Sequence, residues 1–205
     1  MERRETRRRR HGDGEGAAAL LVVDMLNPYD HPEAEELAER VAEALPGVET
    51  LLRRADEADA PVVYVNDNYG DWNSSSEQLA KQAQAGRHPE LVEPILPVEG
   101  NSFVLKARHS TFYETPLEYL LDQMGVGRIV FAGQVTEQCI LYSALDAYVR
   151  HFEVVIATDA VAAIHDDLGD AALRMMERNM SAELVEAEEV DWGVASGDDD
   201  QGDNR

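Results

Sequence analysis

The stretch RIVFAGQVTEQCILYSALDAYVR, residues 128–150, joins two patterns that belong to different secondary structures. Its first part, residues 128–133, is an apolar run rich in β-branched residues, which is typical of a strand covered on both faces. Its last part repeats apolar residues at helical spacing, which predicts a helix over residues 136–150. The stretch therefore predicts a strand that passes almost directly into a helix.

The same alternation of strand and helix continues on both sides of this stretch. The other predicted strands cover residues 19–24, 61–66, 102–106, 153–158 and 181–186. The other predicted helices cover residues 33–45, 47–59, 76–86, 115–124 and 167–179. Regular alternation predicts an α/β fold: a three-layer α/β/α sandwich around a doubly wound, mainly parallel six-stranded sheet of Rossmann-like type, with right-handed crossovers.

The chain of 205 residues is long enough for one well-packed domain. We expect this domain to span residues 17–193, because residues 1–16 form a basic, Gly-rich segment and residues 194–205 a polar, acidic one, and both compositions are typical of disordered tails. A single cysteine makes no internal disulfide, and the apolar run AAALLVVDM is too short for a secretory signal. These features predict a cytoplasmic protein.

The formal net charge is −23, which argues against nucleic acid or an anionic membrane as a partner of the folded body. The only lysines are Lys81 and Lys106, against sixteen arginines. An acid-rich and lysine-poor composition leads to the hypothesis that the chain is adapted to high salt.

In doubly wound sheets, ligands bind outside the carboxyl ends of the strands. Asp24 closes the first predicted strand, Asp67 follows the second, Lys106 closes the third, and the sequence GQVTEQC leaves the fourth. Chemically useful side chains from distant parts of the sequence are therefore expected to meet at one edge of the sheet.

Cys139 is the candidate nucleophile at this edge. With Thr136 as the N-cap, Cys139 occupies the third position of the predicted helix, where free N–H groups and the helix dipole lower the pKa of a thiol. A buried cysteine that only packs beneath the helix is the alternative. Asp24 as a general base and Lys106 as a cation beside the thiol favour the nucleophile.

Three segments resemble the isochorismatase-like cysteine hydrolase superfamily, which includes nicotinamidases and N-carbamoyl amidohydrolases. They are LLVVDMLNPY (20–29), FVLKARHSTFYETPLEYLL (103–121) and IVFAGQVTEQCILYSALDAYVR (129–150), and the resemblance extends over residues 18–187. The individual motifs are weak, but an Asp after the first strand, a Lys after the third and G-x-x-T-x-x-C after the fourth are specific in this order.

The resemblance implies a catalytic triad of Asp24, Lys106 and Cys139, with Cys139 as nucleophile and Asp24 as proton acceptor and later donor. It also implies a cis peptide bond between Gln134 and Val135, and an oxyanion hole made by the N–H groups of Val135 and Cys139. The implied reaction is hydrolysis of a C–N bond in a small-molecule amide or carbamoyl compound through a thioester. Relatives of this kind form homodimers or homotetramers, and we expect the same here.

The segment VNDNYGDW departs from the metal-binding pattern of nicotinamidases. Asp67 is present, but Tyr69 stands where the first metal-binding His would be, and the next histidine is His88. One carboxylate does not hold a divalent ion, so we expect no metal and no other cofactor.

The substrate pocket is the least specific part of the sequence. Tyr29, Trp72, Ser110 and Phe112 are candidate pocket residues, although ordinary core packing explains the aromatic ones equally well. His109 is expected to lie behind the residues that touch substrate, or at the surface. Two alternatives to a C–N hydrolase stay open: a vinyl ether hydrolase of the isochorismatase type, and a non-catalytic scaffold with the same fold.

Overall fold

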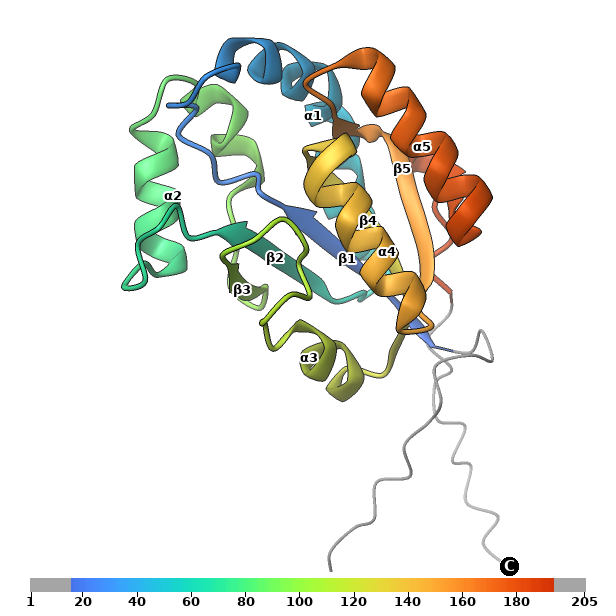
Figure 1. The fold of residues 1–205 in the computed structure, drawn as a ribbon. Helices are drawn as coiled ribbons and strands as arrows, with labels where there is room; N and C mark the ends of the chain where they lie inside the picture. Colours follow the sequence, from blue (N-terminus) through green and yellow to red (C-terminus); the bar gives the residue numbers. More distant parts are fainter. Residues whose placement is uncertain (1–15, 194–205) are drawn as a thin grey trace, which may run out of the picture.

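The computed structural model describes residues 16–193, and its centre is a six-stranded parallel sheet in the order β3-β2-β1-β4-β5-β6 (Figure 1). The strands are β1 (Ala17–Val23), β2 (Val62–Asp67), β3 (Ser102–Lys106), β4 (Val126–Gln134), β5 (Glu153–Ala162) and β6 (Glu183–Val185). The helices are α1 (Ala34–Glu57), α2 (Ser76–Gln84), α3 (Leu117–Gln123), α4 (Leu141–Val149) and α5 (Asp166–Met180). Four short helical turns are η1 (Pro89–Leu91), η2 (Glu93–Ile95), η3 (Thr136–Ile140) and η4 (Ala187–Glu189).

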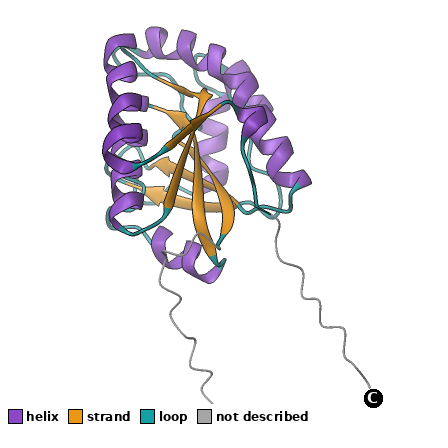
Figure 2. Cartoon of the chain, turned by 90° about the vertical axis from the view of Figure 1, so that its right-hand side faces the viewer, coloured by secondary structure: helices purple, strands orange, loops and turns teal. Residues whose placement is uncertain are grey.

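Helices cover both faces of the sheet, as the edge-on view in Figure 2 shows. Successive residues of β1 point to opposite faces: Leu20 and Val22 belong to the core beneath α1, whereas Leu21 and Val23 belong to the core beneath α3, α4 and α5. Because β1 is buried on both sides, it is an uninterrupted apolar run. The predicted three-layer α/β/α sandwich is confirmed.

The direction of winding reverses between β1 and β4, which lie side by side at the centre of the sheet. Val23, the last residue of β1, pairs with Gly133 near the end of β4. The chain leaves β1 toward α1 on one face and leaves β4 toward α4 on the other. In doubly wound sheets, such a reversal at the carboxyl ends of two strands is where ligands bind.

One expectation for the helices is wrong. The structure has a single helix, α1, with Pro46 inside it, where the sequence predicted two helices separated at this proline. The buried side chains Leu37, Val41, Val48 and Leu51 keep helical spacing across the proline. Their burial against the sheet therefore favours one continuous helix, even though Pro46 removes a backbone N–H donor.

The predicted tails, residues 1–16 and 194–205, lie outside the described residues except for Gly16. Within residues 16–193, no helix combines the length and apolar character that crossing a membrane requires.

Candidate active site

Asp24 is the first residue after β1, and its backbone has the left-handed conformation with φ of 54°. Aspartate adopts this conformation more readily than most residues. The turn is held by a hydrogen bond from Asp24 N to Val65 O of 2.9 Å, and Asp24 Oδ1 accepts a hydrogen bond from Asp67 N at 2.8 Å. The carboxylate is thus fixed at the end of the central strand, and it is buried.

Lys106 is the last residue of β3 and pairs in register with Asp67 on β2. Its Nζ lies 2.8 Å from Asp24 Oδ2 and 3.8 Å from Asp67 Oδ2. The Lys106 side chain is 1% exposed and that of Asp24 is 11% exposed. A buried ammonium group of this kind requires a carboxylate partner, and the strand order of the sheet provides one.

Cys139 lies in η3, a π-helical turn between β4 and α4. Its Sγ accepts a hydrogen bond of 3.5 Å from Lys106 Nζ, whose ammonium group also pairs with the Asp24 carboxylate. The structure therefore brings together the three residues of the predicted triad. The predicted N-cap is wrong, because the cap of this turn is Val135, and Thr136 is buried as the first residue of the turn.

The segment between β4 and Cys139 is anchored on both sides. The Gln134–Val135 peptide bond, for which the resemblance implied cis geometry, is cis, and Gln134 Nε2 donates to Asp24 O at 2.5 Å. On the other side, Glu137 Oε1 accepts the backbone N–H groups of Ile164 and His165, each at 3.0 Å. These contacts tie the start of the turn to β1 and to the start of α5.

The charges around Cys139 act against the predicted low pKa of its thiol. Burial raises the pKa of Cys139, the negative charge of Asp24 raises it further, and Lys106 offsets only part of this effect. The expectation of a lowered pKa is wrong because it considered the helix end but left out burial and the neighbouring carboxylate. In the resting site the thiol is protonated.

Burial also raises the pKa of Asp24, although the charge of Lys106 acts in the opposite direction. For Lys106, burial lowers the pKa, but the nearby carboxyl groups, Asp24 above all, raise it, and the pKa of Lys106 lies above its usual value. The site therefore pairs the Lys106 ammonium group with a carboxyl group of raised pKa, beside a thiol of raised pKa. Its carboxylate is more basic than an aspartate in water, which suits a general base.

His109 is exposed, which agrees with the expectation of a surface position, but it also contacts the thiol, which the sequence did not predict. Its Nδ1 lies 3.8 Å from Cys139 Sγ, so the ring contacts the thiol directly, although the residue is exposed on its other side. The ring also packs against Tyr142 of α4, with centroids 5.6 Å apart. A signal was present in the sequence, since His109 follows Lys106 by three residues, but loop direction cannot be read from spacing.

The four predicted pocket residues do not share one environment. Tyr29 is fully buried, with its ring edge-on to His88, and Trp72 is 80% exposed. Phe112 packs against Phe152 within the core beneath α3 and α4. Ser110 Oγ donates to Asp146 of α4 and accepts the N–H of Phe112, which holds the loop after β3.

The residues after β2 do not fit a divalent metal ion. Asp67 faces the Lys106 ammonium and accepts the N–H of Tyr69, whereas His88 lies between Glu35 and Glu90. Within residues 16–193, no three His, Cys, Asp or Glu side chains form a group that could hold a metal.

Comparisons with known proteins agree with this geometry. Residues 18–189 match the model of the isochorismatase domain. The uncharacterized isochorismatase family protein YaaI of Bacillus subtilis is 33% identical over 84% of this chain and 95% of its own length. Maleamate amidohydrolase of Pseudomonas putida is 29% identical over 76% of each chain.

Solved structures show the same architecture. The N-carbamoylsarcosine amidase of Thermoplasma acidophilum superposes with a TM-score of 0.65 at 26% identity, over 85% of this chain and 99% of its own. The nicotinamidase PncA of Bacillus subtilis superposes with a TM-score of 0.66 at 24% identity, over 83% of this chain and 99% of its own, and supports the fold. The chain belongs to the isochorismatase family, and it is a hydrolase.

Proposed function

We propose that this protein is a cysteine amidohydrolase that cleaves a C–N bond in a small amide or carbamoyl compound. The observation that carries the proposal is the position of the Lys106 ammonium, 2.8 Å from Asp24 Oδ2 and 3.5 Å from Cys139 Sγ. An acid, a cation and a thiol from three separate strand ends have no packing reason to meet in a buried cluster. A nucleophilic thiol with its own base explains the arrangement.

The reaction begins with proton transfer from the thiol to Asp24 as Cys139 Sγ attacks the carbonyl carbon. The Lys106 ammonium stabilises the thiolate as it forms, so the raised resting pKa of the thiol does not prevent attack. The nitrogen takes up a proton as the C–N bond breaks, water then hydrolyses the thioester, and the sulfur regains its proton from Asp24.

The developing oxyanion is bound by the N–H groups of Val135 and Cys139 at the start of η3. In this turn, Ile140 N donates to Val135 O at 3.1 Å and Gln138 N donates to the same oxygen at 3.0 Å, so neither bond uses the N–H of Cys139. Backbone donors in the first turn of a helix are available to an anion, and removal of one such donor typically slows an enzyme by ~10²–10³-fold.

The test is ammonia or amine release from a panel of compounds. The names of the relatives suggest N-carbamoylsarcosine, maleamate, ureidoacrylate and nicotinamide, and isochorismate represents the vinyl ether alternative. We expect turnover of at least one amide, and a loss of about 10³-fold or more in Cys139→Ala and Lys106→Ala. Lys81→Ala is the matched control, because Lys81 is the other lysine of the chain and is exposed on α2.

A covalent intermediate gives a second readout. Rapid quenching of the wild-type protein with its substrate should add the acyl mass to the peptide that contains Cys139. Turnover that survives in Cys139→Ala would exclude the thioester route, and turnover of isochorismate alone would favour the vinyl ether alternative.

A further inference from the structure

Lys106 and His109 contact Cys139 Sγ, Asp24 pairs with Lys106 beside it, and these three side chains differ in their access to solvent. Asp24 and Lys106 are buried, at 8% and 2% exposure, whereas His109 is exposed. A substrate carbonyl must reach the sulfur from a side that the buried pair does not occupy. Of these contacts His109 is the one that reaches solvent, and a substrate that entered along it would place its leaving nitrogen beside the imidazole.

The imidazole is held in place by contacts with α4. His109 packs against Tyr142, its neighbour Ser110 donates to Asp146, and Thr111 N donates to Ser143 Oγ at 2.9 Å. Three successive loop residues are thus fixed to the helix that follows Cys139. His109 Nδ1 therefore lies 3.8 Å from Cys139 Sγ in a loop that contacts with α4 hold in place.

We propose that His109 is a second proton-transfer group of this site, which protonates the departing nitrogen and later accepts a proton from the hydrolytic water. The inference rests on the proposed amidohydrolase function. Amide nitrogen is a poor leaving group unless it is protonated, and imidazole exchanges protons in the neutral pH range. Asp24, which receives the thiol proton, is then free to keep it beside the sulfur.

The protons balance over one cycle. In the first step the C–S bond forms, the thiol proton moves to Asp24, and the carbonyl π electrons move to the oxygen. In the second step the C–N bond breaks, the electron pair of the oxyanion re-forms the C=O bond, and the leaving nitrogen takes a proton from the His109 imidazolium. In the third step water attacks the thioester, its proton returns to His109, the C–S bond breaks, and the sulfur recovers its proton from Asp24.

His109→Ala tests the assignment with two substrates. With the amide that the wild-type protein hydrolyses, kcat should fall by about 10²–10⁴-fold, because the amine must leave without its acid. With p-nitrophenyl acetate, whose phenolate needs no proton to leave, the rate of the initial burst should change by less than about threefold, while the steady-state rate falls because deacylation still needs a base. A group that only positions the thiol would slow both acylation reactions equally.

Added imidazole provides an independent readout, since the side chain lies at an exposed position. Imidazole should restore amide turnover in His109→Ala in proportion to its concentration. His165→Ala is the control, because His165 is an exposed histidine at the start of α5, and added imidazole should not change the amide turnover of this variant. Equal losses on the amide and in the ester burst, without rescue, would overturn the role of His109 and leave the amidohydrolase proposal intact. If the wild-type protein hydrolysed no amide, both proposals would be removed.

Discussion

At the scale of single residues, the two charges beside the thiol act on it in opposite directions. Asp24 raises the pKa of Cys139, and Lys106 lowers it. Asp24→Asn removes the first effect and keeps the second, so it should lower the pKa of the thiol. We expect alkylation of Cys139 by iodoacetamide at pH 7 to be slower in the wild-type protein than in a free thiol, and to accelerate about tenfold for each unit by which the pKa falls in Asp24→Asn.

The same variant should lose its activity, because it lacks the base that accepts the thiol proton. Faster alkylation combined with lost turnover separates thiolate formation from catalysis. Lys106→Met should slow alkylation further, and Cys139→Ser shows that the measured rate comes from the only thiol of the chain. Slower alkylation in Asp24→Asn than in the wild-type protein would contradict the opposing effects of the two charges on the thiol.

The Asp24–Lys106 pair also affects stability. Lys106→Met leaves a buried carboxylate without its cation and should lower the free energy of unfolding by about 3–5 kcal/mol at pH 7. The loss should be smaller near pH 4. Burial raises the pKa of Asp24 above 3.8, and a carboxyl group whose pKa is raised in the folded state lowers stability only at a pH where it is ionised. Chemical denaturation at both pH values measures this difference.

A double variant identifies the source of that loss. Asp24→Asn combined with Lys106→Met removes both charges, and it should be more stable than Lys106→Met alone. If the double variant lost as much free energy of unfolding as Asp24→Asn and Lys106→Met lose together, the two charges would not be coupled.

The sequence predicted that the three triad residues would meet because each ends or follows a strand, and a parallel sheet collects such ends on one edge. Asp24, Lys106 and Cys139 were selected in this way. The contact of His109 with the thiol was missed because it depends on how the loop after β3 folds back on α4, and neither strand periodicity nor motif spacing contains that information. The predicted direction of the pKa shift of Cys139 was wrong for a related reason, because burial is a property of the assembled site.

At the scale of elements, α1 shows how packing overrides a local signal. A proline is read as the end of a helix, but α1 continues through Pro46 because apolar positions stay in phase on both sides of it. The strands were predicted more reliably than this helix, since continuous β-branched runs have few other interpretations. The alternation predicted the doubly wound parallel sheet but not its strand order, and the continuity of α1 depends on its packing against the sheet.

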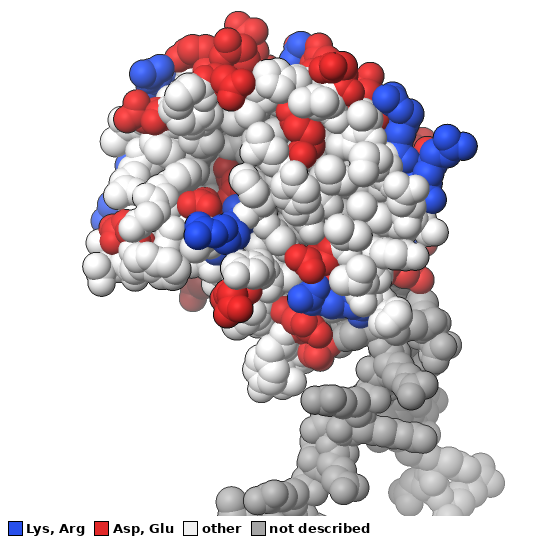
Figure 3. Space-filling view, in the orientation of Figure 1, with Lys and Arg blue, Asp and Glu red and all other residues white. Residues whose placement is uncertain are grey.

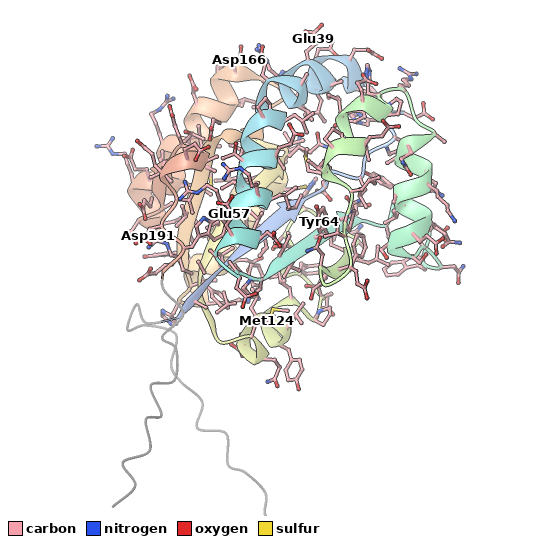
Figure 4. All side chains as sticks on the ribbon, turned by 180° about the vertical axis from the view of Figure 1, so that it is seen from behind. Glu39, Glu57, Tyr64, Met124, Asp166 and Asp191 are labelled. Carbon is pink, nitrogen blue, oxygen red and sulfur yellow. The ribbon has the colours of Figure 1, made fainter. Side chains whose placement is uncertain are left out.

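At Gly47, α1 lies close to the backbone of β5. A Cβ at this position would lie 2.3 Å from Asp159 O, a backbone atom that has little freedom to move. Gly47→Ala should therefore lower the free energy of unfolding by about 1–3 kcal/mol, although alanine is ~1 kcal/mol better than glycine in a helix interior. Figure 4 shows α1 on this side of the molecule, with Glu39 and Glu57 toward its opposite ends.

Glu49→Ala is the matched control in the same helix. Glu49 is exposed two residues after Gly47, so its substitution should change the free energy of unfolding by less than about 0.5 kcal/mol. Thermal unfolding of both variants provides the measurement. A stabilised Gly47→Ala protein would show that the helix can move away from β5.

At the scale of the whole molecule, charge is distributed unevenly. On the face shown in Figure 3, uncharged atoms cover most of the area over α4, and acidic side chains gather along the upper edge. Lysines and arginines pair with many of the acids, as Arg40 does with Glu43 and Asp166, but the chain retains a net charge of −23. Acidic groups without a cation repel one another, and this repulsion opposes the compact state.

Salt should therefore stabilise the protein through screening. The Debye length falls from ~30 Å at 0.01 M to ~3 Å at 1 M salt, so the thermal unfolding midpoint should rise as NaCl increases over this range. Replacing Glu36, Glu39 and Glu49 on the exposed face of α1 with glutamine removes three negative charges without changing size. This variant should unfold at a higher temperature than the wild-type protein in dilute buffer and gain less from salt. If the glutamine variant gained as much thermal stability from salt as the wild-type protein, the gain would come from hydrophobic burial, which salt also strengthens. If the unfolding midpoint of the wild-type protein did not rise with salt, the hypothesis of adaptation to high salt would be contradicted.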